Sequence, residues 1–342
     1  MLLYPPDPWL RPEASCLADF SAPNIVHFRL AMMLTVLVGG VVSGYLASSR
    51  FGMPEHFAKK IMTIVLVCFD GLIALFVIWP MHLARQLIWL PITGLVLMLT
   101  ITALSVVIFY FLESDHRSRL TLILSGGLSN TGYTGGAFVC YALFGIAGLA
   151  LANIYLLLSL PFFYIVYLPA LKVRELRTEA RSSKLKLDFL LDPRMLPVPA
   201  MIAAIVLNLT NVKSPAFIEK FHIVDILVYI ASSLFFFAIG LRVKFSRFKN
   251  YISLYFPVAA VKFILTPAVA LLIIALLTLT GQNLDGLVKK VIIVLSTAPC
   301  AVLMVTMSNV FDLDSPLASA LWVVTTVIFV VIVVPVLFFL FA

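Results

Sequence analysis

The chain is poor in charge. Only 12% of its 342 residues are Asp, Glu, Lys or Arg, and 62% are apolar or aromatic. Because a soluble domain carries about 25% charged residues, this chain has too little polar surface to stay in water. The composition excludes a soluble enzyme, a nucleic-acid-binding protein and a disordered scaffold. Apolar runs of 18 or more residues predict membrane-spanning helices rather than the short alternating strands of a barrel.

Paired cysteines and cofactor motifs are also missing. The four cysteines stand singly at Cys16, Cys68, Cys140 and Cys300, with no CxxC spacing, so neither a disulfide framework nor a zinc site is predicted. No GxxxxGK loop indicates an ATP-driven pump. The five histidines are spread along the chain, which argues against a membrane enzyme. We therefore expect no enzymatic activity, no cofactor and no metal.

Apolar runs and their breaks predict ten spans in an all-α polytopic protein. The spans are 25–49, 59–80, 86–112, 120–144, 147–171, 195–210, 224–242, 251–279, 287–310 and 316–342. Sixteen of the 24 Lys and Arg residues fall on one side of this topology and seven on the other. Since the basic side is normally cytoplasmic, both termini are predicted to face outward in a cell membrane, plasma or bacterial inner.

The only sizeable polar linker divides the membrane part into two nearly equal halves. An extracytoplasmic segment, 1–24, is followed by five spans in 25–171, a basic cytoplasmic linker in 172–194 and five spans in 195–342. Halves with an odd number of spans enter the membrane from opposite sides. The sequence therefore predicts an inverted repeat, although the two halves show no obvious identity.

Glycine is scarce, yet it clusters in and just after the fourth span. Seven of the 16 glycines lie between residues 126 and 148, beside Ser129, Asn130 and Thr131. Because hydrocarbon cannot satisfy an Asn amide, this segment must be buried in protein or line a water-filled cavity. Tight helix packing would explain the glycines but not Asn130.

The ninth span has a matching interruption. Pro299 removes one backbone hydrogen bond in mid-membrane, next to Ser296 and Cys300. Asn130 and Pro299 stand at nearly the same distance from the start of their halves. Interrupted helices at corresponding positions of two inverted halves indicate a transporter's substrate site. Their free N–H groups would favour an anionic group such as a carboxylate.

Two ionisable residues lie deep in predicted spans. Asp70 and Lys262 are each about 16 Å from the start of their span at 1.5 Å per residue, near the bilayer midplane. Each would cost about 2.5 to 3.5 kcal/mol against lipid, so both are expected to face the interior. We expect either an Asp70–Lys262 pair or two separate members of a polar site that couples transport to protons or charge. A buried bridge that only fixes packing is the competing interpretation.

These residues resemble the auxin efflux carrier family, which includes the plant PIN carriers and bacterial organic-acid permeases. The family's fourth-span motif N-T-x-x-x-G-x-P is matched by Asn130, Thr131 and Gly135, but Ala137 stands where its proline would fall. Pro299 matches the family's ninth-span proline. Lys262, Phe263 and Pro267 resemble a basic, an aromatic and a proline position of its eighth span.

The resemblance implies a scaffold domain, a mobile transport domain, and two broken helices that cross where the substrate anion docks, as in the sodium/proton antiporter and bile-acid symporter folds. It implies direct substrate binding by Asn130. The predicted substrate site consists of Ser129, Asn130, Thr131, Gly132, Gly135, Ser296, Pro299 and Cys300, with Asp70 and Lys262 as coupling candidates. A homodimer through the scaffold domain is left open.

The sequence thus predicts a secondary or facilitative carrier of a small organic anion, working by alternating access in the lipid bilayer. The nearest alternative is a sodium- or proton-coupled symporter of the bile-acid type. Neither interrupted span has an acid in its interior, which disfavours a cation/proton exchanger, although carbonyls and hydroxyls could still hold sodium. A polytopic enzyme is the alternative from another class.

Overall fold

The structure is a computed structural model that describes residues 23–53, 55–132, 135–163, 165, 196–242, 251–311 and 313–341. This part of the chain is helical and contains no β-strand, only one isolated bridge. The predicted all-α class is therefore confirmed for the described residues. The predicted N-terminal segment, 1–24, falls almost wholly outside the described residues, and the predicted linker, 172–194, does so entirely.

The described helices overlap the predicted spans, although the predicted fourth span is divided between α5 and the start of α6. In the first half they are α1 (Pro23–Phe51), α2 (Glu55–Ile64), the π-helical η2 (Val65–Asp70), α3 (Gly71–Ile78), the 3-10 turn η3 (Arg85–Ile88), α4 (Trp89–Leu112), α5 (His116–Gly127) and α6 (Gly136–Phe162). In the second half they are α8 (Pro197–Leu209), α9 (Ala216–Lys220), α10 (Ile223–Arg242), α11 (Ile252–Ala260), the π-helical η8 (Val261–Leu265), α12 (Thr266–Leu279), α13 (Gly286–Ser296), α14 (Val302–Val310), α15 (Ser315–Ile328), the π-helical η9 (Phe329–Val333) and α16 (Val334–Phe341).

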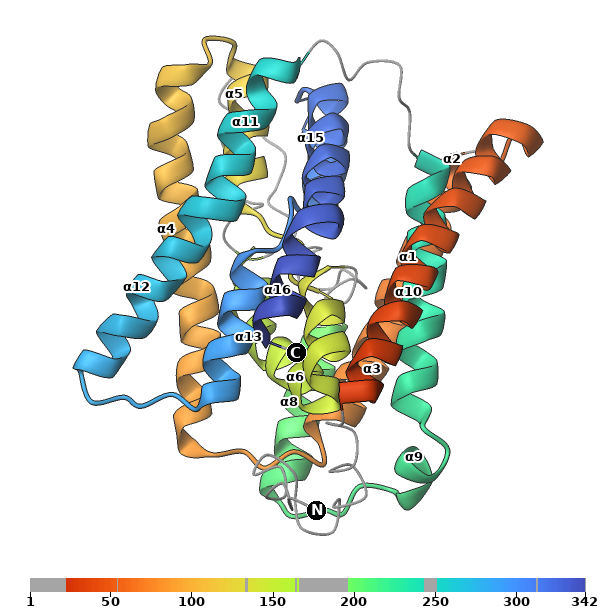
Figure 1. The fold of residues 1–342 in the computed structure, drawn as a ribbon, viewed down its shortest axis with the longest axis vertical. Coiled ribbons are helices and arrows are strands. Elements are labelled where there is room, and N and C mark those ends of the chain that lie inside the picture. Colours follow the sequence, from red (N-terminus) through yellow and green to blue (C-terminus); the bar gives the residue numbers. More distant parts are fainter. Residues whose placement is uncertain are drawn as a thin grey trace, which may run out of the picture.

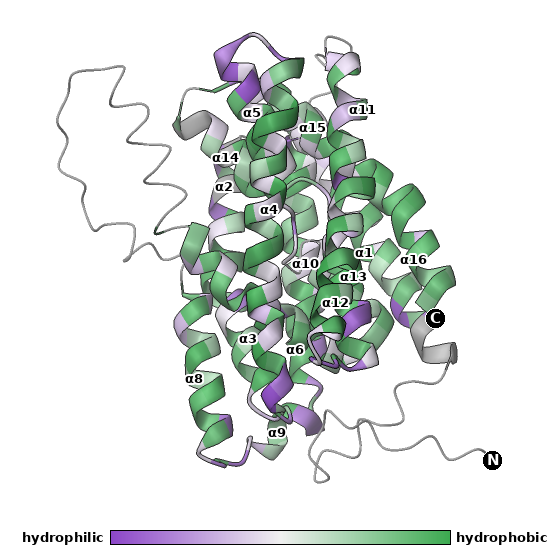
Figure 2. Cartoon of the chain, turned by 90° about the vertical axis from the view of Figure 1, so that its left-hand side faces the viewer, coloured by the Kyte–Doolittle hydropathy of each residue, from purple (hydrophilic) through white to green (hydrophobic). Residues whose placement is uncertain are grey.

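Seven described helical stretches are long and apolar enough to cross a membrane. They are His27–Phe51, His56–Ile78, Arg85–Leu112, Gly136–Phe162, Ile223–Gly240, Ile252–Leu279 and Ser315–Phe341. Large apolar side chains on their outer faces are open to the surroundings: Phe111 is 81% exposed, Leu279 83% and Phe339 90%. In water each would forgo roughly 2 kcal/mol of burial, so these faces fit lipid. Figure 2 shows hydrophobic residues along the helices and hydrophilic ones mainly near the two ends of the bundle.

The helices pack in two groups (Figure 1). In the first group α1 packs along α10, α3 along α8, and α2 against α10. Small residues allow this closeness, because a Cβ on Gly44 would lie 2.0 Å from the Phe237 carbonyl oxygen. The second group contains α4, α5, α11 to α16 and most of α6. We call them the α1–α10 group and the α4–α15 group.

The chain reverses direction inside α6, at Gly145. This residue has φ 65° and ψ −152°, which only glycine adopts readily. A Cβ on Gly148 would lie 2.5 Å from the Cys140 carbonyl oxygen, whereas eight residues of straight helix would separate the two by about 12 Å. The turn separates the predicted fourth span, ending at 144, from the predicted fifth, beginning at 147.

Candidate functional site

The two predicted interruptions meet in the middle of the bundle. α5 ends at Gly127 and α6 begins at Gly136, while α13 ends at Ser296 and α14 begins at Val302. We call the two linking segments, 128–135 and 297–301, the first and second breaks. The Asn130 N–H donates to the Pro299 carbonyl over 2.8 Å, and the Ala301 N–H donates to the Leu128 carbonyl over 3.1 Å. Ser129 and Cys300 thus form an isolated antiparallel bridge at the crossing.

The first break is closed by its own backbone and by crowded glycines. The Asn130 carbonyl accepts from the Gly136 N–H over 2.9 Å, and the Thr131 carbonyl accepts from the Ala137 N–H over 3.0 Å. A Cβ on Gly135 would lie 2.2 Å from the Asn130 carbonyl oxygen, so no larger residue fits there without a backbone shift. Gly132 differs, because nothing lies within 4 Å of the same position on it.

The second break is shorter and is opened by proline. Pro299 has no N–H, so α13 cannot continue through it. The Ala298 N–H donates to the Leu295 carbonyl over 3.2 Å, and the Cys300 N–H donates to the Thr325 hydroxyl over 3.2 Å. Beyond them, the N–H groups of Val302 and Leu303 donate to no acceptor among the described residues. They stand at the positive end of the α14 dipole.

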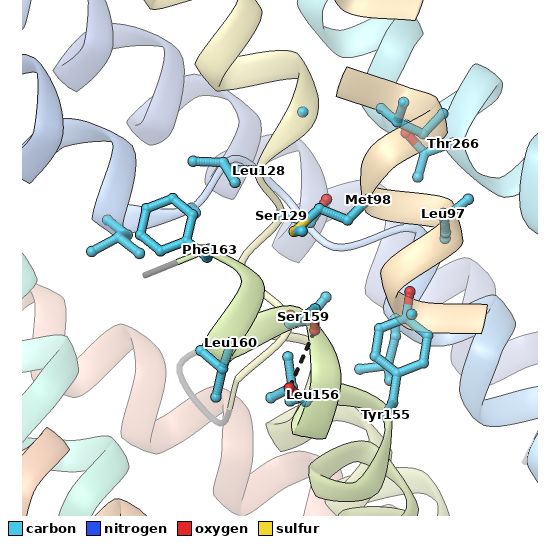
Figure 3. Close-up of a pocket in the computed structure, with 17 residues that line it drawn as sticks. Leu97, Met98, Leu128, Ser129, Tyr155, Leu156, Ser159, Leu160, Phe163 and Thr266 are labelled. Atoms are coloured by element: carbon cyan, nitrogen blue, oxygen red, sulfur yellow. Dashed lines mark hydrogen bonds between the residues drawn. The ribbon is translucent and has the colours of Figure 1, made fainter. Parts of the chain in front are cut away.

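A small cavity of about 100 Å³ lies beside the crossing (Figure 3). Figure 3 shows Tyr155 and Ser159 of α6 facing Leu97 and Met98 of α4. The lining is mainly apolar and includes residues of both breaks. Its residues are Gly94, Leu97, Met98, Ile101, Gly127, Leu128, Ser129, Thr131, Tyr155, Leu156, Ser159, Leu160, Phe163, Thr266, Leu295, Ala301 and Leu303.

Only part of the predicted site lines this cavity. Ser129 and Thr131 do so, whereas Asn130 is buried, with its side chain against Gly135. Pro299 and Cys300 sit at the crossing, where the Cys300 thiol donates to the Ser125 carbonyl over 3.3 Å.

The remaining predicted positions are less engaged with the cavity. The Ser296 hydroxyl turns back to the Ile293 carbonyl of its own helix, 2.7 Å away. The cavity is also lined by Tyr155, Ser159 and Thr266, which no sequence pattern predicts because single hydroxyls in apolar helices form no pattern. No described residues form a cluster of acids, histidines and cysteines that could hold a metal ion.

Lys262 reaches the first break from η8. Its side chain is fully buried, and its Nζ donates to the Leu128 carbonyl over 2.7 Å and to the Ser129 hydroxyl over 2.9 Å. Asp70 lies elsewhere, on η2 in the α1–α10 group, and is partly exposed. Both residues are described and form no ion pair with each other, so of the two expected arrangements the structure does not show the Asp70–Lys262 pair. The sequence places Asp70 and Lys262 at the same depth in their spans, but residues at the same depth need not lie on neighbouring helices.

A second polar cluster joins the two helix groups. The Tyr141 hydroxyl of α6 donates to the Asp225 carboxylate of α10, whose other oxygen lies 3.3 Å from the His222 Nδ1. The guanidinium of Arg29, on α1, stands over the Tyr141 ring, 5.6 Å from its centroid, and Tyr229 packs edge-on against the same ring. Arg29 is buried. This cluster supplies polar side-chain contacts between α6 and the α1–α10 group.

No protein-family model matches the chain, and no curated protein matches it. The likeness to auxin efflux carriers rests on the motifs at Asn130, Pro299 and Lys262.

Proposed function

We propose that this protein is a carrier of the auxin efflux carrier type, which moves a small organic anion across the membrane by alternating access. The observation that carries this proposal is the crossing itself, where two interrupted helices are bound to each other by backbone hydrogen bonds at their breaks. Interrupted backbone at membrane depth is tolerated where it lines a cavity or is buried in protein.

The polarity of the crossing favours an anion. Val302 and Leu303 offer N–H groups without a described acceptor, next to the cavity-lining Ala301. A carboxylate could accept from such groups at a helix N-terminus without any cationic side chain. The Asn130 amide would add a donor from the first break. The cavity volume of about 100 Å³ suits a substrate of a few heavy atoms.

The two helix groups supply the parts that alternating access needs. In this proposal the spans number ten in two inverted repeats, the α1–α10 group is the scaffold, and the α4–α15 group moves against it. The contacts among Arg29, Tyr141 and Asp225 would then have to rearrange in each cycle, because they join the groups. The basic residues would keep the 172–194 linker in the cytoplasm and both termini outside.

Binding of carboxylates to the purified protein tests this function. A panel of small organic acids would be screened by thermal unfolding, with and without sodium and across pH. Asn130→Ala should weaken the binding of any hit about tenfold, the equivalent of about 1.4 kcal/mol for a lost hydrogen bond to a charged group. Asn153→Ala is the matched control, since Asn153 is also buried but donates to the Leu149 carbonyl within its own helix.

The proposal fails if no organic anion raises the unfolding temperature. It also fails if Asn130→Ala and Asn153→Ala bind and transport the hit as the unchanged protein does.

A further inference from the structure

Lys262 places a positive charge where the first interrupted helix ends. Its Nζ lies 2.7 Å from the Leu128 carbonyl oxygen, one residue past the end of α5, and 2.9 Å from the Ser129 hydroxyl oxygen. Carbonyls at a helix C-terminus carry partial negative charge and attract cations. The Leu128 carbonyl also accepts the Ala301 N–H, so one oxygen ties the lysine to both breaks.

The oxygens around the ammonium are neutral. They are a backbone carbonyl and a hydroxyl, the hard donors that also bind alkali cations. Among the described residues, the Cys300 thiol is the titratable group that acts on Lys262, and no described carboxylate forms an ion pair with the lysine. The ammonium is therefore held as a metal cation would be held, by dipoles at a helix end.

The local helix geometry brings the lysine to this position. Lys262 belongs to η8, a π-helical turn in which the Thr266 hydroxyl donates to the Val261 carbonyl, five residues earlier. Such turns inside α-helices are rare and frequently mark functional sites. The lysine does not line the cavity, but Ser129 and Leu128, which it holds, both do.

We propose that the ε-ammonium of Lys262 is a tethered cation that takes the place of a metal cation between the Leu128 carbonyl and the Ser129 hydroxyl, so that the protein needs no sodium there. The inference rests on the proposed function and deepens it. In a coupled carrier a bound cation would supply the positive charge at the crossing, and here a side chain of the protein itself supplies it. Lys262 acts as a positioning residue that fixes the Leu128 carbonyl and the Ser129 hydroxyl at the crossing.

Chemical rescue tests the proposal without any substrate. Thermal unfolding of the purified full chain would be compared in chloride salts of choline, sodium and ammonium at equal ionic strength. Choline is too large to enter the site. The unchanged protein should unfold at the same temperature in all three salts, because its cation is built in.

Two substitutions at position 262 separate charge from packing. Lys262→Ala leaves the two oxygens facing an emptied space, so its lowered unfolding temperature should rise by about 3 °C or more in ammonium or sodium relative to choline. Lys262→Met fills the same space without charge, so it should be destabilised equally in every salt.

Stabilisation of the unchanged protein by sodium over choline would overturn the proposal, even if Lys262→Ala did not fold. Equal unfolding temperatures of Lys262→Ala in the three salts would also overturn it. Since no organic anion takes part, failure of the carrier hypothesis in the carboxylate screen would not alter this result.

Discussion

Both breaks interrupt a helix at the crossing, but they do so with different chemistry. The first spans eight residues, 128–135, relies on glycine, and satisfies its carbonyls through N–H groups of Gly136 and Ala137. The second spans five, 297–301, relies on Pro299, and leaves the N–H groups of Val302 and Leu303 without a described acceptor. The first break therefore fixes the shape of the crossing, and the second offers the donors. Substitutions that disturb the shape of the first break should therefore mainly lower stability. Substitutions that disturb the donors of the second break should mainly lower affinity for the proposed anion.

The largest effect is expected from Gly135→Ala. The new Cβ would lie 2.2 Å from the Asn130 carbonyl oxygen, and backbone cannot yield cheaply. Overpacking of this kind costs about 3 kcal/mol, so the unfolding temperature should fall clearly. Gly132→Ala is the matched control, because its Cβ meets nothing within 4 Å and should cost under about 0.5 kcal/mol. Equal unfolding temperatures for the two variants would show that crowding does not shape the first break.

A medium effect is expected where the start of α5 is held to the start of α15. The Asp314 carboxylate caps α15 by accepting the Leu317 N–H over 3.0 Å, and it also accepts from the hydroxyls of Ser118 on α5 and Tyr251. Asp314→Ala removes all three bonds and should cost about 2 kcal/mol.

Asp285→Ala provides the comparison for the three hydrogen bonds to Asp314. Asp285 caps α13 through the single Leu287 N–H, 2.8 Å away, so its loss should cost about 1 kcal/mol. Urea or thermal unfolding of both variants measures the difference. If Asp285→Ala proved as costly as Asp314→Ala, the bonds to Ser118 and Tyr251 would contribute nothing.

The smallest effect on stability, but a large one on binding, is expected from Pro299→Ala. Alanine restores an N–H that can bond within α13 and extend the helix into the second break, with a stability change of about 1 kcal/mol or less. If the protein binds an anion as proposed, its affinity for that anion should fall, because the extended helix shortens the second break. Pro257→Ala, at a proline inside α11 and outside both breaks, should leave affinity unchanged. A Pro299→Ala protein with full affinity would mean that proline is not what opens the second break.

Much of the architecture could be predicted because it depends on local chemistry. Apolar length predicts the spans, glycine clustering predicts the first break, and a mid-membrane proline predicts the second. The gap between the fourth and fifth spans also coincides with the positive φ at Gly145. Each of these signals is contained in a few neighbouring residues.

Partners across helices could not be predicted in the same way. Arithmetic on depth put Asp70 and Lys262 at the same level but could not say which helices touch, so the partner of Lys262 turned out to be the first break. The cavity wall gains Tyr155, Ser159 and Thr266 from three-dimensional packing alone. A single hydroxyl in an apolar run is compatible with a lipid-facing or an interior position.

The bridge between Ser129 and Cys300 is made entirely of main-chain atoms. Any residue with an ordinary peptide group can supply those donors and acceptors, so the join itself does not depend on which side chains stand there. Side chains that neither crowd the backbone, as one at position 135 would, nor interrupt it, as Pro299 does, can therefore change while the two helices stay joined.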